Sequence, residues 1–258
     1  KKDLDYASLN RYLSFLWCPG EGTPFKQVRK VQPGRALIIS QGKIESEWTW
    51  YNLPIYTPST SPIKRNDAIL GTAKHLQQAV ERQMVADVPV GAFLSGGLDS
   101  SAIVAFAKEI NPEIRCFTIK TSGGNEQDML EDLPYAKKVA KHLNVQLDVI
   151  SVDANQMAHN LEKMVVQLDE PLADPACLNV LYISQLARDN GIKVLLSGTG
   201  GDDLFTGYRR HFALSLERYW NWMPSVVRSK FENMTAALDQ RNVLSRRLTK
   251  MFNGSGLS

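Results

Sequence analysis

Beyond residue 63, the apolar positions follow a helical spacing and then a strand-like spacing, several times in turn. Apolar residues from Ile69 to Met84 recur at every third or fourth position, which predicts an amphipathic helix. The next run, Val88 to Leu94, is apolar almost without interruption. Such a run is typical of a strand that is buried on both faces of a parallel sheet.

The alternation continues as far as residue 196. Further helices are predicted at Ser100–Glu109, Leu133–Leu143, Gln156–Leu168 and Leu178–Asp189, and further strands at Ile114–Ile119, Val145–Val149 and Lys193–Leu196. Strands that are separated by helices indicate right-handed crossovers and a parallel sheet. We therefore expect an α/β fold, in which an open parallel sheet has helices on both faces and a helical C-terminal part follows.

The first 57 residues show a different pattern. A short amphipathic helix is predicted at Tyr6–Leu16, and two strands, Arg35–Ile39 and Glu45–Tyr51, flank the turn Gln41-Gly42 as in a hairpin. Residues 58–63 are rich in Pro, Ser and Thr, which indicates a linker. The expected organisation is a small α+β part at residues 1–57, the linker, and a larger domain at residues 64–258.

Composition places the chain among ordinary globular proteins. Its 258 residues are 43% hydrophobic and 22% charged, which excludes the disordered, collagenous and disulfide-rich classes. Three widely spaced cysteines, Cys18, Cys116 and Cys177, form no paired motif. They indicate reduced thiols and a cytoplasmic location. The apolar runs are too short to cross a bilayer, so no membrane contact is expected.

Positive charge is concentrated near the C-terminus. The net charge is only +3, yet residues 209–258 contain nine basic and three acidic residues. Solvated helix faces are the simpler interpretation of this cluster, and contact with a polyanion is the alternative. The net charge alone is too small to argue for a nucleic acid partner.

The most informative stretch is Ser95-Gly96-Gly97-Leu98-Asp99-Ser100-Ser101, which lies between a predicted buried strand and a predicted helix. Consecutive glycines let several backbone N–H groups point at one anion, and the helix N-terminus adds its positive dipole end. The stretch therefore predicts a phosphate-binding loop, although it lacks the lysine of a Walker A loop. Because Asp99 would repel a phosphate, we infer that Mg²⁺ bridges the two.

The stretch S-G-G-L-D-S resembles the PP-loop of the ATP pyrophosphatases, which have the adenine nucleotide alpha-hydrolase-like fold. Other segments are similar to the asparagine synthetase (glutamine-hydrolysing) family within that superfamily. The segments that carry this resemblance are Leu196–Tyr208, Asp169–Ala176, Leu133–Ala136 and Phe25–Gly34. The last of them is similar to the end of the glutaminase domain of that family.

The resemblance implies a set of site residues. Asp99 and Asp202 are expected to be catalytic and to share the Mg²⁺ ion. The expected ATP-binding residues are Leu94, Ile119, Ser197 and Gly198 around the base and ribose, and Ser95, Gly96, Gly97, Asp99 and Ser100 around the pyrophosphate. Both glycine turns follow predicted parallel strands, at the sheet edge where open α/β sheets bind ligands.

The implied activity is ATP-dependent amide formation. A small-molecule carboxylate, aspartate or a related acid, is adenylated with release of pyrophosphate, and ammonia then displaces AMP. Thr199 stands where the family usually has an acid, and Asp203 replaces the usual Glu, which leaves the acceptor open. We also expect the chain to be a fragment, with the ammonia-producing cysteine missing and the synthetase domain truncated at its C-terminus.

Two alternatives are kept. The first is another adenylating PP-loop enzyme, such as a tRNA-modifying one, for which the basic C-terminal part would contact the nucleic acid. The second is a nucleotide-binding module without turnover. A nucleic acid partner is otherwise not expected, and the oligomeric state is left open, with a homodimer as one option.

Overall fold

The computed structural model describes residues 3–54, 63–122, 132–208, 211, 230 and 234–235. It divides into two compact units, residues 1–197 and residues 198–258, each of which is described by itself. The predicted linker at residues 58–63 and the predicted helical part at residues 209–258 lie almost entirely outside the described residues. Within the described residues, no helix is both long enough and apolar enough to cross a bilayer.

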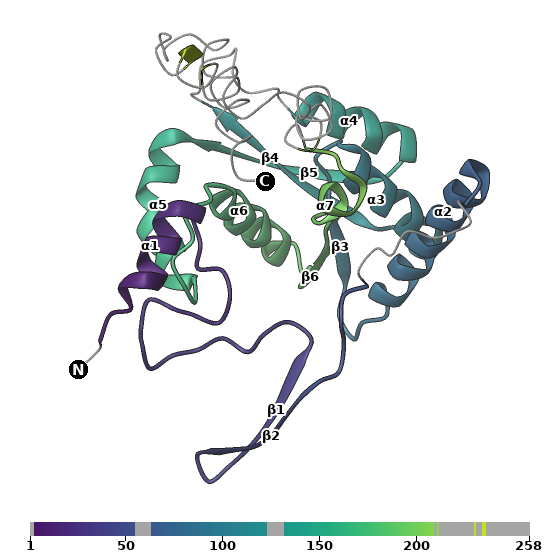
Figure 1. Ribbon diagram of the computed structural model, residues 1–258. Helices are drawn as coiled ribbons and strands as arrows, with labels where there is room; N and C mark the ends of the chain where they lie inside the picture. The colour runs from purple at the N-terminus through teal and green to yellow at the C-terminus, as the bar shows by residue number, and fades with distance from the viewer. Residues whose placement is uncertain are drawn as a thin grey trace. The chain divides into compact units, whose positions relative to one another are not determined.

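The first unit contains a four-stranded parallel sheet with the strand order β5-β4-β3-β6 (Figure 1). Its strands are β3 (Val90–Phe93), β4 (Arg115–Ser122), β5 (Gln146–Asp153) and β6 (Val194–Leu196). The helices between and before them are α2 (Arg65–Gln83), α3 (Leu98–Ile110), α4 (Asp132–Leu143), α5 (Ala154–Gln167) and α6 (Ala176–Asp189). The predicted α/β fold with a parallel sheet is confirmed.

Helices cover both faces of this sheet. Neighbouring residues of a strand point to opposite faces, so Cys116 and Phe117 of β4 lie in different buried clusters. Cys116 belongs to one buried cluster, in which α2, α3 and α4 pack on the sheet, and Phe117 belongs to the other, which includes Ile183 and Ala187 of α6. Figure 1 shows α6 on the side of the sheet away from α2 and α3. The central strands are therefore buried on both faces, as their apolar runs predict.

Strands β4 and β5 are longer than their apolar patterns predict. Eight residues of each strand are paired, from Arg115 opposite Gln146 to Ser122 opposite Asp153. The added pairs include Lys120 with Ser151, which are polar residues that the backbone ladder holds without help from an apolar side chain. The added part of β5 also contains Ile150 and the buried residue Val152, which the predicted strand end at Val149 left out.

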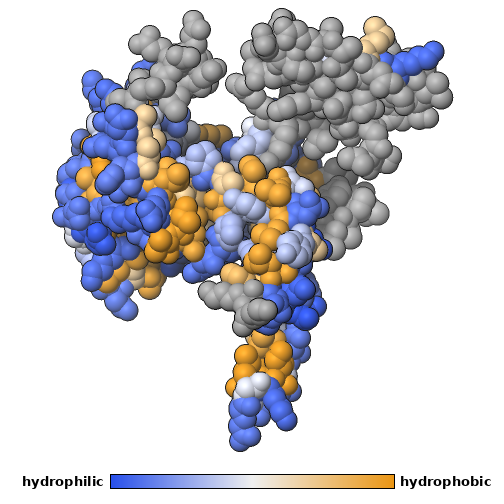
Figure 2. Space-filling model, turned by 90° about the vertical axis from the view of Figure 1, so that its left-hand side faces the viewer, coloured by the Kyte–Doolittle hydropathy of each residue, from blue (hydrophilic) through white to orange (hydrophobic). Residues whose placement is uncertain are grey.

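The N-terminal part of the first unit consists of α1 (Tyr6–Phe15) and the antiparallel hairpin of β1 (Arg35–Ser40) and β2 (Lys43–Thr49). Gln41 and Gly42 have φ values of 48° and 73°, as a tight hairpin turn requires. All of β2 is exposed, including Ile44 and Trp48, and the apolar surface of the hairpin is visible at the foot of Figure 2. Within the described part of the chain, these apolar side chains are left exposed, whereas hairpins normally pack such side chains against other elements.

Candidate active site

The first glycine-rich turn joins β3 to α3. Leu94 continues β3 by one residue, since its N–H donates to the carbonyl of Phe117 on β4 at 3.0 Å. Its side chain is only 1% exposed and belongs to the same buried cluster as Cys116. Leu94 is therefore buried at the end of the strand, and its contact with ATP stays a prediction.

Gly96 fits closely against the start of α4. Its φ of +84° lies in the left-handed region, which glycine adopts without strain. A Cβ at this position would lie 2.3 Å from the backbone nitrogen of Ala136 and 2.5 Å from the carbonyl carbon of Tyr135. Both atoms belong to the backbone, so no side chain fits here. The structure thus brings together the S-G-G-L-D-S turn and the Leu133–Ala136 segment, which the sequence singled out separately.

Three serine hydroxyls hold the turn together. The Ser95 and Ser100 hydroxyl oxygens are 3.0 Å apart, and the N–H of Gly97 donates to the Ser95 hydroxyl at 3.3 Å. The hydroxyls of Ser100 and Ser101 both donate to the carbonyl of Gly97, at 3.2 and 2.6 Å. Ser100 is 8% exposed. Its hydroxyl is therefore a brace within the turn that fixes the backbone ahead of the helix.

The N-terminus of α3 has the features of an anion site. Gly97 is the N-cap residue, and no side chain caps the helix. The first-turn N–H groups of a helix have no partner within the helix, and the helix dipole adds partial positive charge beside them. Asp99, a half-buried residue of this first turn, is the acidic group that accompanies them. Together these features suit a phosphate group that is accompanied by a cation.

Ile119 lies on β4 and is half-buried. It packs against the cluster that contains Phe117, on the α6 face of the sheet, whereas Leu94 belongs to the opposite cluster. Leu94 and Ile119, two of the four residues that the family resemblance assigns to the ATP base and ribose, therefore lie on opposite faces of neighbouring strands.

The second glycine-rich turn leaves β6 through the exposed residue Ser197 and leads to the short helix α7 (Gly201–Phe205). Within the turn, the N–H of Gly201 donates to the carbonyl of Gly198 at 3.1 Å. Gly200, the N-cap residue of α7, has a φ of +94°. The predicted residues Ser197, Gly198 and Asp202 are thus consecutive parts of one turn and the helix that follows.

Gly207 lies within the Leu196–Tyr208 segment but is not among the predicted site residues. A Cβ at this position would lie 1.6 Å from the carboxylate oxygen Oδ1 of Asp202, and the N–H of Gly207 donates to the Asp202 carbonyl at 3.1 Å. Gly207 therefore leaves the room that the Asp202 carboxylate occupies. The contact is local, because Thr206 caps α7 in the left-handed region with a φ of 62° and turns the chain back onto Asp202, as at many helix C-termini.

The predicted pair of magnesium ligands is divided between the two units. Asp99 belongs to residues 1–197 and Asp202 to residues 198–258, so their shared Mg²⁺ ion stays a prediction. Among the residues that the structure describes, no group of three or more His, Cys, Asp or Glu side chains gathers as a metal site. Mg²⁺ commonly binds through one or two carboxylates together with substrate phosphates, and the residue types predicted here suit that mode.

Comparison with known families bears on the whole of this arrangement. The model of the asparagine synthase family matches residues 71–255, a range that includes both glycine-rich turns. The chain belongs to the asparagine synthase family. The resemblance that the sequence motifs carry is confirmed, and the turns described above are parts of the domain that defines this family.

Two curated relatives from Bacillus subtilis (strain 168) illustrate the similarity. The chain is 33% identical over 210 residues to asparagine synthetase [glutamine-hydrolyzing] 1. This match covers 80% of this chain and 31% of the relative. The chain is 28% identical over 219 residues to asparagine synthetase [glutamine-hydrolyzing] 3. That match covers 80% of this chain and 34% of the relative. The chain thus spans about a third of the length of these asparagine synthase relatives.

Among solved structures, the chain is similar to an NH3-dependent NAD synthetase from Campylobacter jejuni. The match covers 75% of this chain and 93% of that chain, with 12% sequence identity and a TM-score of 0.35. At that score, the superposition adds nothing to the assignment to the asparagine synthase family.

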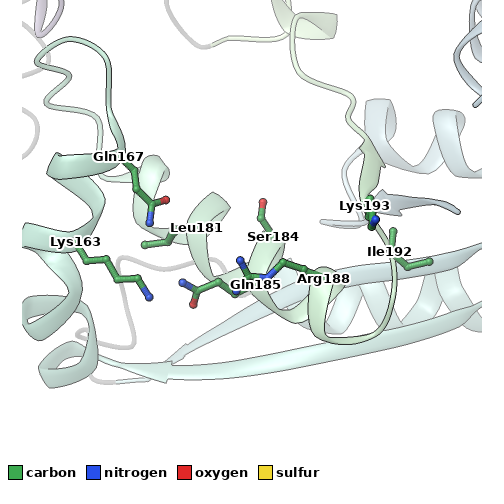
Figure 3. A pocket seen from close by; sticks show the side chains of 8 residues that line it. All are labelled: Lys163, Gln167, Leu181, Ser184, Gln185, Arg188, Ile192 and Lys193. Carbon is green, nitrogen blue, oxygen red and sulfur yellow. The ribbon is translucent and has the colours of Figure 1, made fainter. Parts of the chain in front are cut away.

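A hollow of about 390 Å³ lies elsewhere in the first unit (Figure 3). Its lining residues come from α5, from α6 and from the two residues directly before β6. The N–H of Lys193 donates to the carbonyl of Pro89 ahead of β3, which places the hollow near the edge where these parallel strands begin. The glycine turn of the asparagine synthase domain leaves β3 at the opposite edge. The lining residues are Lys163, Gln167, Leu181, Ser184, Gln185, Arg188, Ile192 and Lys193.

Proposed function

We propose that residues 64–258 form the synthetase domain of a glutamine-dependent amide-forming ligase, which adenylates a carboxylate and transfers ammonia to it. The observation that carries this proposal is the turn at Gly96 and Gly97, which packs against α4 and ends at the uncapped N-terminus of α3. That arrangement offers backbone donors to the phosphates of ATP. Use of ATP fits a cytoplasmic enzyme.

The residues of the turn act by holding backbone N–H groups in fixed positions around the phosphates of ATP. The N–H groups at the start of α3 bind the β- and γ-phosphates and favour their departure as pyrophosphate, because fixed donors need no reorganisation when charge develops. The Ser95, Ser100 and Ser101 hydroxyls keep these donors in place. Leu94 and Ser197 follow β3 and β6, at the sheet edge where the nucleoside end would bind.

Asp99 and Asp202 are the residues that would hold Mg²⁺. The ion supplies positive charge that offsets the charge of the phosphates when it is bound. Asp99 is suited to this role because it stands in the first turn of α3. Asp202 is suited because Gly207 leaves space at its carboxylate.

The reaction balances in two steps. A carboxylate oxygen of the acceptor attacks the α-phosphorus of ATP in line, the bond between the α-phosphorus and the bridging oxygen breaks, and pyrophosphate leaves. Ammonia then attacks the acyl carbon of the acyl-adenylate, the acyl–oxygen bond breaks, and the products are the amide, AMP and a proton. The protein contributes positioning and electrostatic stabilisation.

The acceptor is aspartate or a related acid. Thr199 follows Gly198 in the second turn, where an acid would be able to accept hydrogen bonds from an amino group of the acceptor. A threonine hydroxyl carries no charge, so this position gives less attraction to a cationic amine. We therefore include acids without an α-amino group in the range of acceptors.

Residues 1–57 are proposed to belong to a glutaminase-type domain, with residues 58–63 as the linker. The exposed apolar residues of the β1–β2 hairpin, Ile39, Ile44 and Trp48 among them, support this proposal. A hairpin of this kind needs further strands to cover its apolar side chains. In such an enzyme the glutaminase supplies the ammonia.

Oxygen-isotope transfer tests the proposed reaction. The protein is incubated with ATP, Mg²⁺, ammonium and a panel of acids whose carboxylates carry ¹⁸O, and AMP is examined by mass spectrometry. Adenylation transfers one carboxylate oxygen to AMP, so we expect ¹⁸O in AMP, and AMP, pyrophosphate and amide in equal amounts. Formation of ADP and inorganic phosphate would contradict the proposal, and ATP binding without AMP would favour a module without turnover.

A matched pair of variants checks the site. Asp99 and Asp67 are both acidic residues in the first turn of a helix, α3 and α2 respectively. Asp99→Asn is expected to lower AMP formation by about a hundredfold or more, because a ligand of the cation is lost. Asp67→Asn is expected to leave the rate unchanged. Equal activity of the two variants would contradict the assignment of Asp99.

A further inference from the structure

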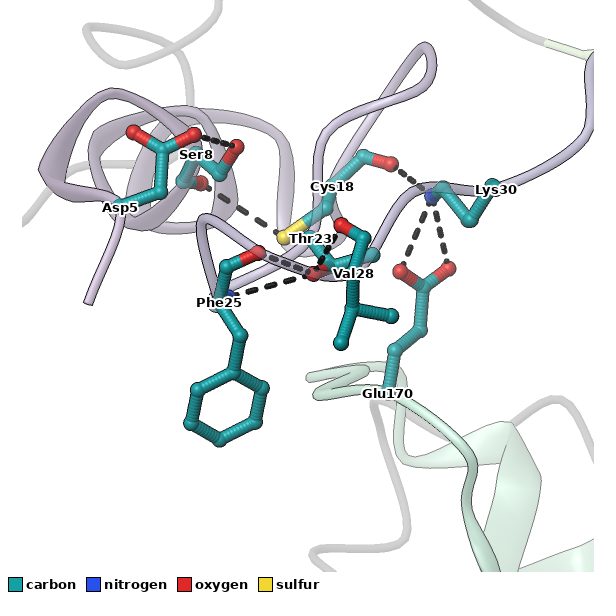
Figure 4. A network of polar contacts seen from close by, with 8 residues as sticks. All are labelled: Asp5, Ser8, Cys18, Thr23, Phe25, Val28, Lys30 and Glu170. Carbon is teal, nitrogen blue, oxygen red and sulfur yellow. Dashed lines mark hydrogen bonds and ion pairs between the residues drawn. The ribbon is translucent and has the colours of Figure 1, made fainter. Parts of the chain in front are cut away.

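A polar network joins the N-terminal part of the chain to the loop between α5 and α6 (Figure 4). The ammonium group of Lys30 donates to both carboxylate oxygens of Glu170, at 3.0 and 2.9 Å. It also donates to the carbonyl of Cys18 and lies 5.4 Å from the centre of the Trp17 ring. A single cation thus binds the loop and two residues of the segment after α1.

A backbone hydrogen bond runs beside this ion pair. The N–H of Ala173 donates to the carbonyl of Leu16 at 2.9 Å. Leu16 is the C-cap residue of α1 and has a φ of 66°, so its backbone has turned out of the helix. The loop at residues 168–175 is therefore attached to the N-terminal part at two points, Glu170 and Ala173.

The ion pair is partly removed from water. The side chains of Lys30 and Glu170 are both 29% exposed. Cys18 beside them is fully buried, and burial raises the pKa of its thiol, with the Glu170 carboxylate adding to the effect. Removing one member of such a pair leaves the other partly desolvated and without its partner, so the geometry of the loop depends on Lys30.

The attached loop leads to the end of the sheet where the strands finish. Helix α6 ends at Asp189, shortly before β6 begins at Val194, so it runs against the parallel strands and starts at their carboxyl ends. A carboxylate oxygen of Asp174 accepts the N–H of Ala176 at 2.9 Å and fixes the loop to this start. The loop thus enters the edge at which the turn of Gly96 also lies.

We propose that Lys30 is a positioning residue, which acts through Glu170 to hold the loop at residues 168–175 in the shape that the acceptor side of the site requires. The kinetic part of this inference rests on the proposed function, whereas the structural part does not. Lys30 lies in the region assigned to a glutaminase-type domain and Glu170 in the synthetase domain. The pair is therefore a direct connection through which the first region sets the geometry of the second.

Hydrogen exchange tests the structural part without any assay of activity. Lys30→Met removes the charge but keeps the length of the side chain, and Lys26→Met changes an exposed lysine of the same segment. We expect peptides covering residues 168–176 to exchange about tenfold faster in Lys30→Met, and to be unchanged in Lys26→Met. Glu170→Gln, which keeps the shape of the side chain, serves as a second variant in case Lys30→Met does not fold. Unchanged exchange in the folded variants would overturn the inference.

Kinetics test the functional part. In the ammonia-dependent reaction, Lys30→Met is expected to raise KM for the acceptor about tenfold while KM for ATP changes less than about twofold. Lys30→Arg, whose planar group can bind both Glu170 oxygens, is expected to restore most of the loss. An equal rise in both KM values would overturn the positioning role. Absence of AMP from the wild-type protein would count against the proposed function alone, because the exchange experiment stands apart from it.

Discussion

The two glycine-rich turns both follow a strand of the parallel sheet, but they are stabilised in different ways. The turn after β3 is held by its own serine hydroxyls and also by its surroundings, since Gly96 touches the backbone of α4 and Ser100 is almost fully buried. For the turn after β6, the described residues show contacts between Gly198 and Gly201 and between Asp202 and Gly207. Contact with α4 thus ties the first turn to the core of the first unit, whereas the contact described for Gly207 is with a side chain of its own turn.

This difference separates two roles that glycine has in the protein. At Gly96, a side chain would collide with backbone atoms that cannot move without shifting α4. At Gly207, it would collide with the end of the Asp202 side chain, which can rotate away. A substitution at Gly96 should therefore lower the free energy of unfolding, and a substitution at Gly207 should mainly lower the rate of AMP formation.

The largest expected effect is that of Gly96→Ala. The new Cβ would meet the backbone nitrogen of Ala136 at 2.3 Å, and the φ of +84° is unfavourable for alanine. We expect the free energy of unfolding to fall by about 2 kcal/mol or more and ATP binding to be lost. Chemical denaturation and the binding of a fluorescent ATP analogue measure the two effects.

Gly97→Ala is the matched control for this variant. Gly97 has an extended backbone with φ −69°, and a Cβ there would lie 3.4 Å from its nearest neighbour, the Ser95 hydroxyl oxygen. The loss of stability should stay below about 1 kcal/mol, the cost of alanine at an N-cap. Equal losses in the two variants would mean that contact with α4 does not distinguish the first turn.

Gly207→Ala is expected to have the next largest effect, and that effect should fall on catalysis. The new methyl group would occupy the place of the Asp202 Oδ1 atom, 1.6 Å away, so the carboxylate must rotate. We expect AMP formation to fall by about tenfold or more, with a stability change below about 1 kcal/mol.

A double-variant cycle identifies the cause of that loss. If Gly207 acts by leaving room for Asp202, then Gly207→Ala should cost little in a protein that already carries Asp202→Ala. Additive losses would indicate that Gly207 matters for the fold of the second turn itself.

Ser100→Ala gives a smaller effect, which measures the brace within the first turn. The Ser100 hydroxyl bonds with the Gly97 carbonyl and the Ser95 hydroxyl, at 3.2 and 3.0 Å, in a site that is 8% exposed. The carbonyl keeps Ser101 as a donor, so we expect a loss of about 1 kcal/mol in unfolding free energy. Ser101→Ala, measured by the same denaturation, should cost less because Ser101 is more exposed; the reverse order would contradict the role given to Ser100.

Much of this contrast could not be predicted from the sequence. The strand, the turn and the helix around Gly96 follow from an apolar run, a glycine pair and a helical spacing, which are local signals. The contact of Gly96 with Tyr135 joins residues about 40 positions apart, whereas the contact of Gly207 with Asp202 is local, across the end of α7. The Lys30–Glu170 pair spans 140 positions, and nothing in the local pattern of either residue reveals its partner.

The last effect is absent at neutral pH and appears only in alkali, as a pH dependence of stability that tests how dry the core beneath the first turn is. Cys116 lies on β4 beside Ala92 of β3 and is fully buried. Burial, with a contribution from the Asp148 carboxylate, raises the pKa of its thiol from 9.0 to about 12. Above about pH 9 the unfolded chain loses this proton and the folded chain keeps it, so stability falls as the pH rises. Denaturation of wild type and Cys116→Val between about pH 9 and pH 11 should show an added loss of up to about 1.4 kcal/mol per pH unit in wild type only. Identical slopes would mean that water reaches Cys116, and the first turn would then rest on a looser core than its contacts indicate.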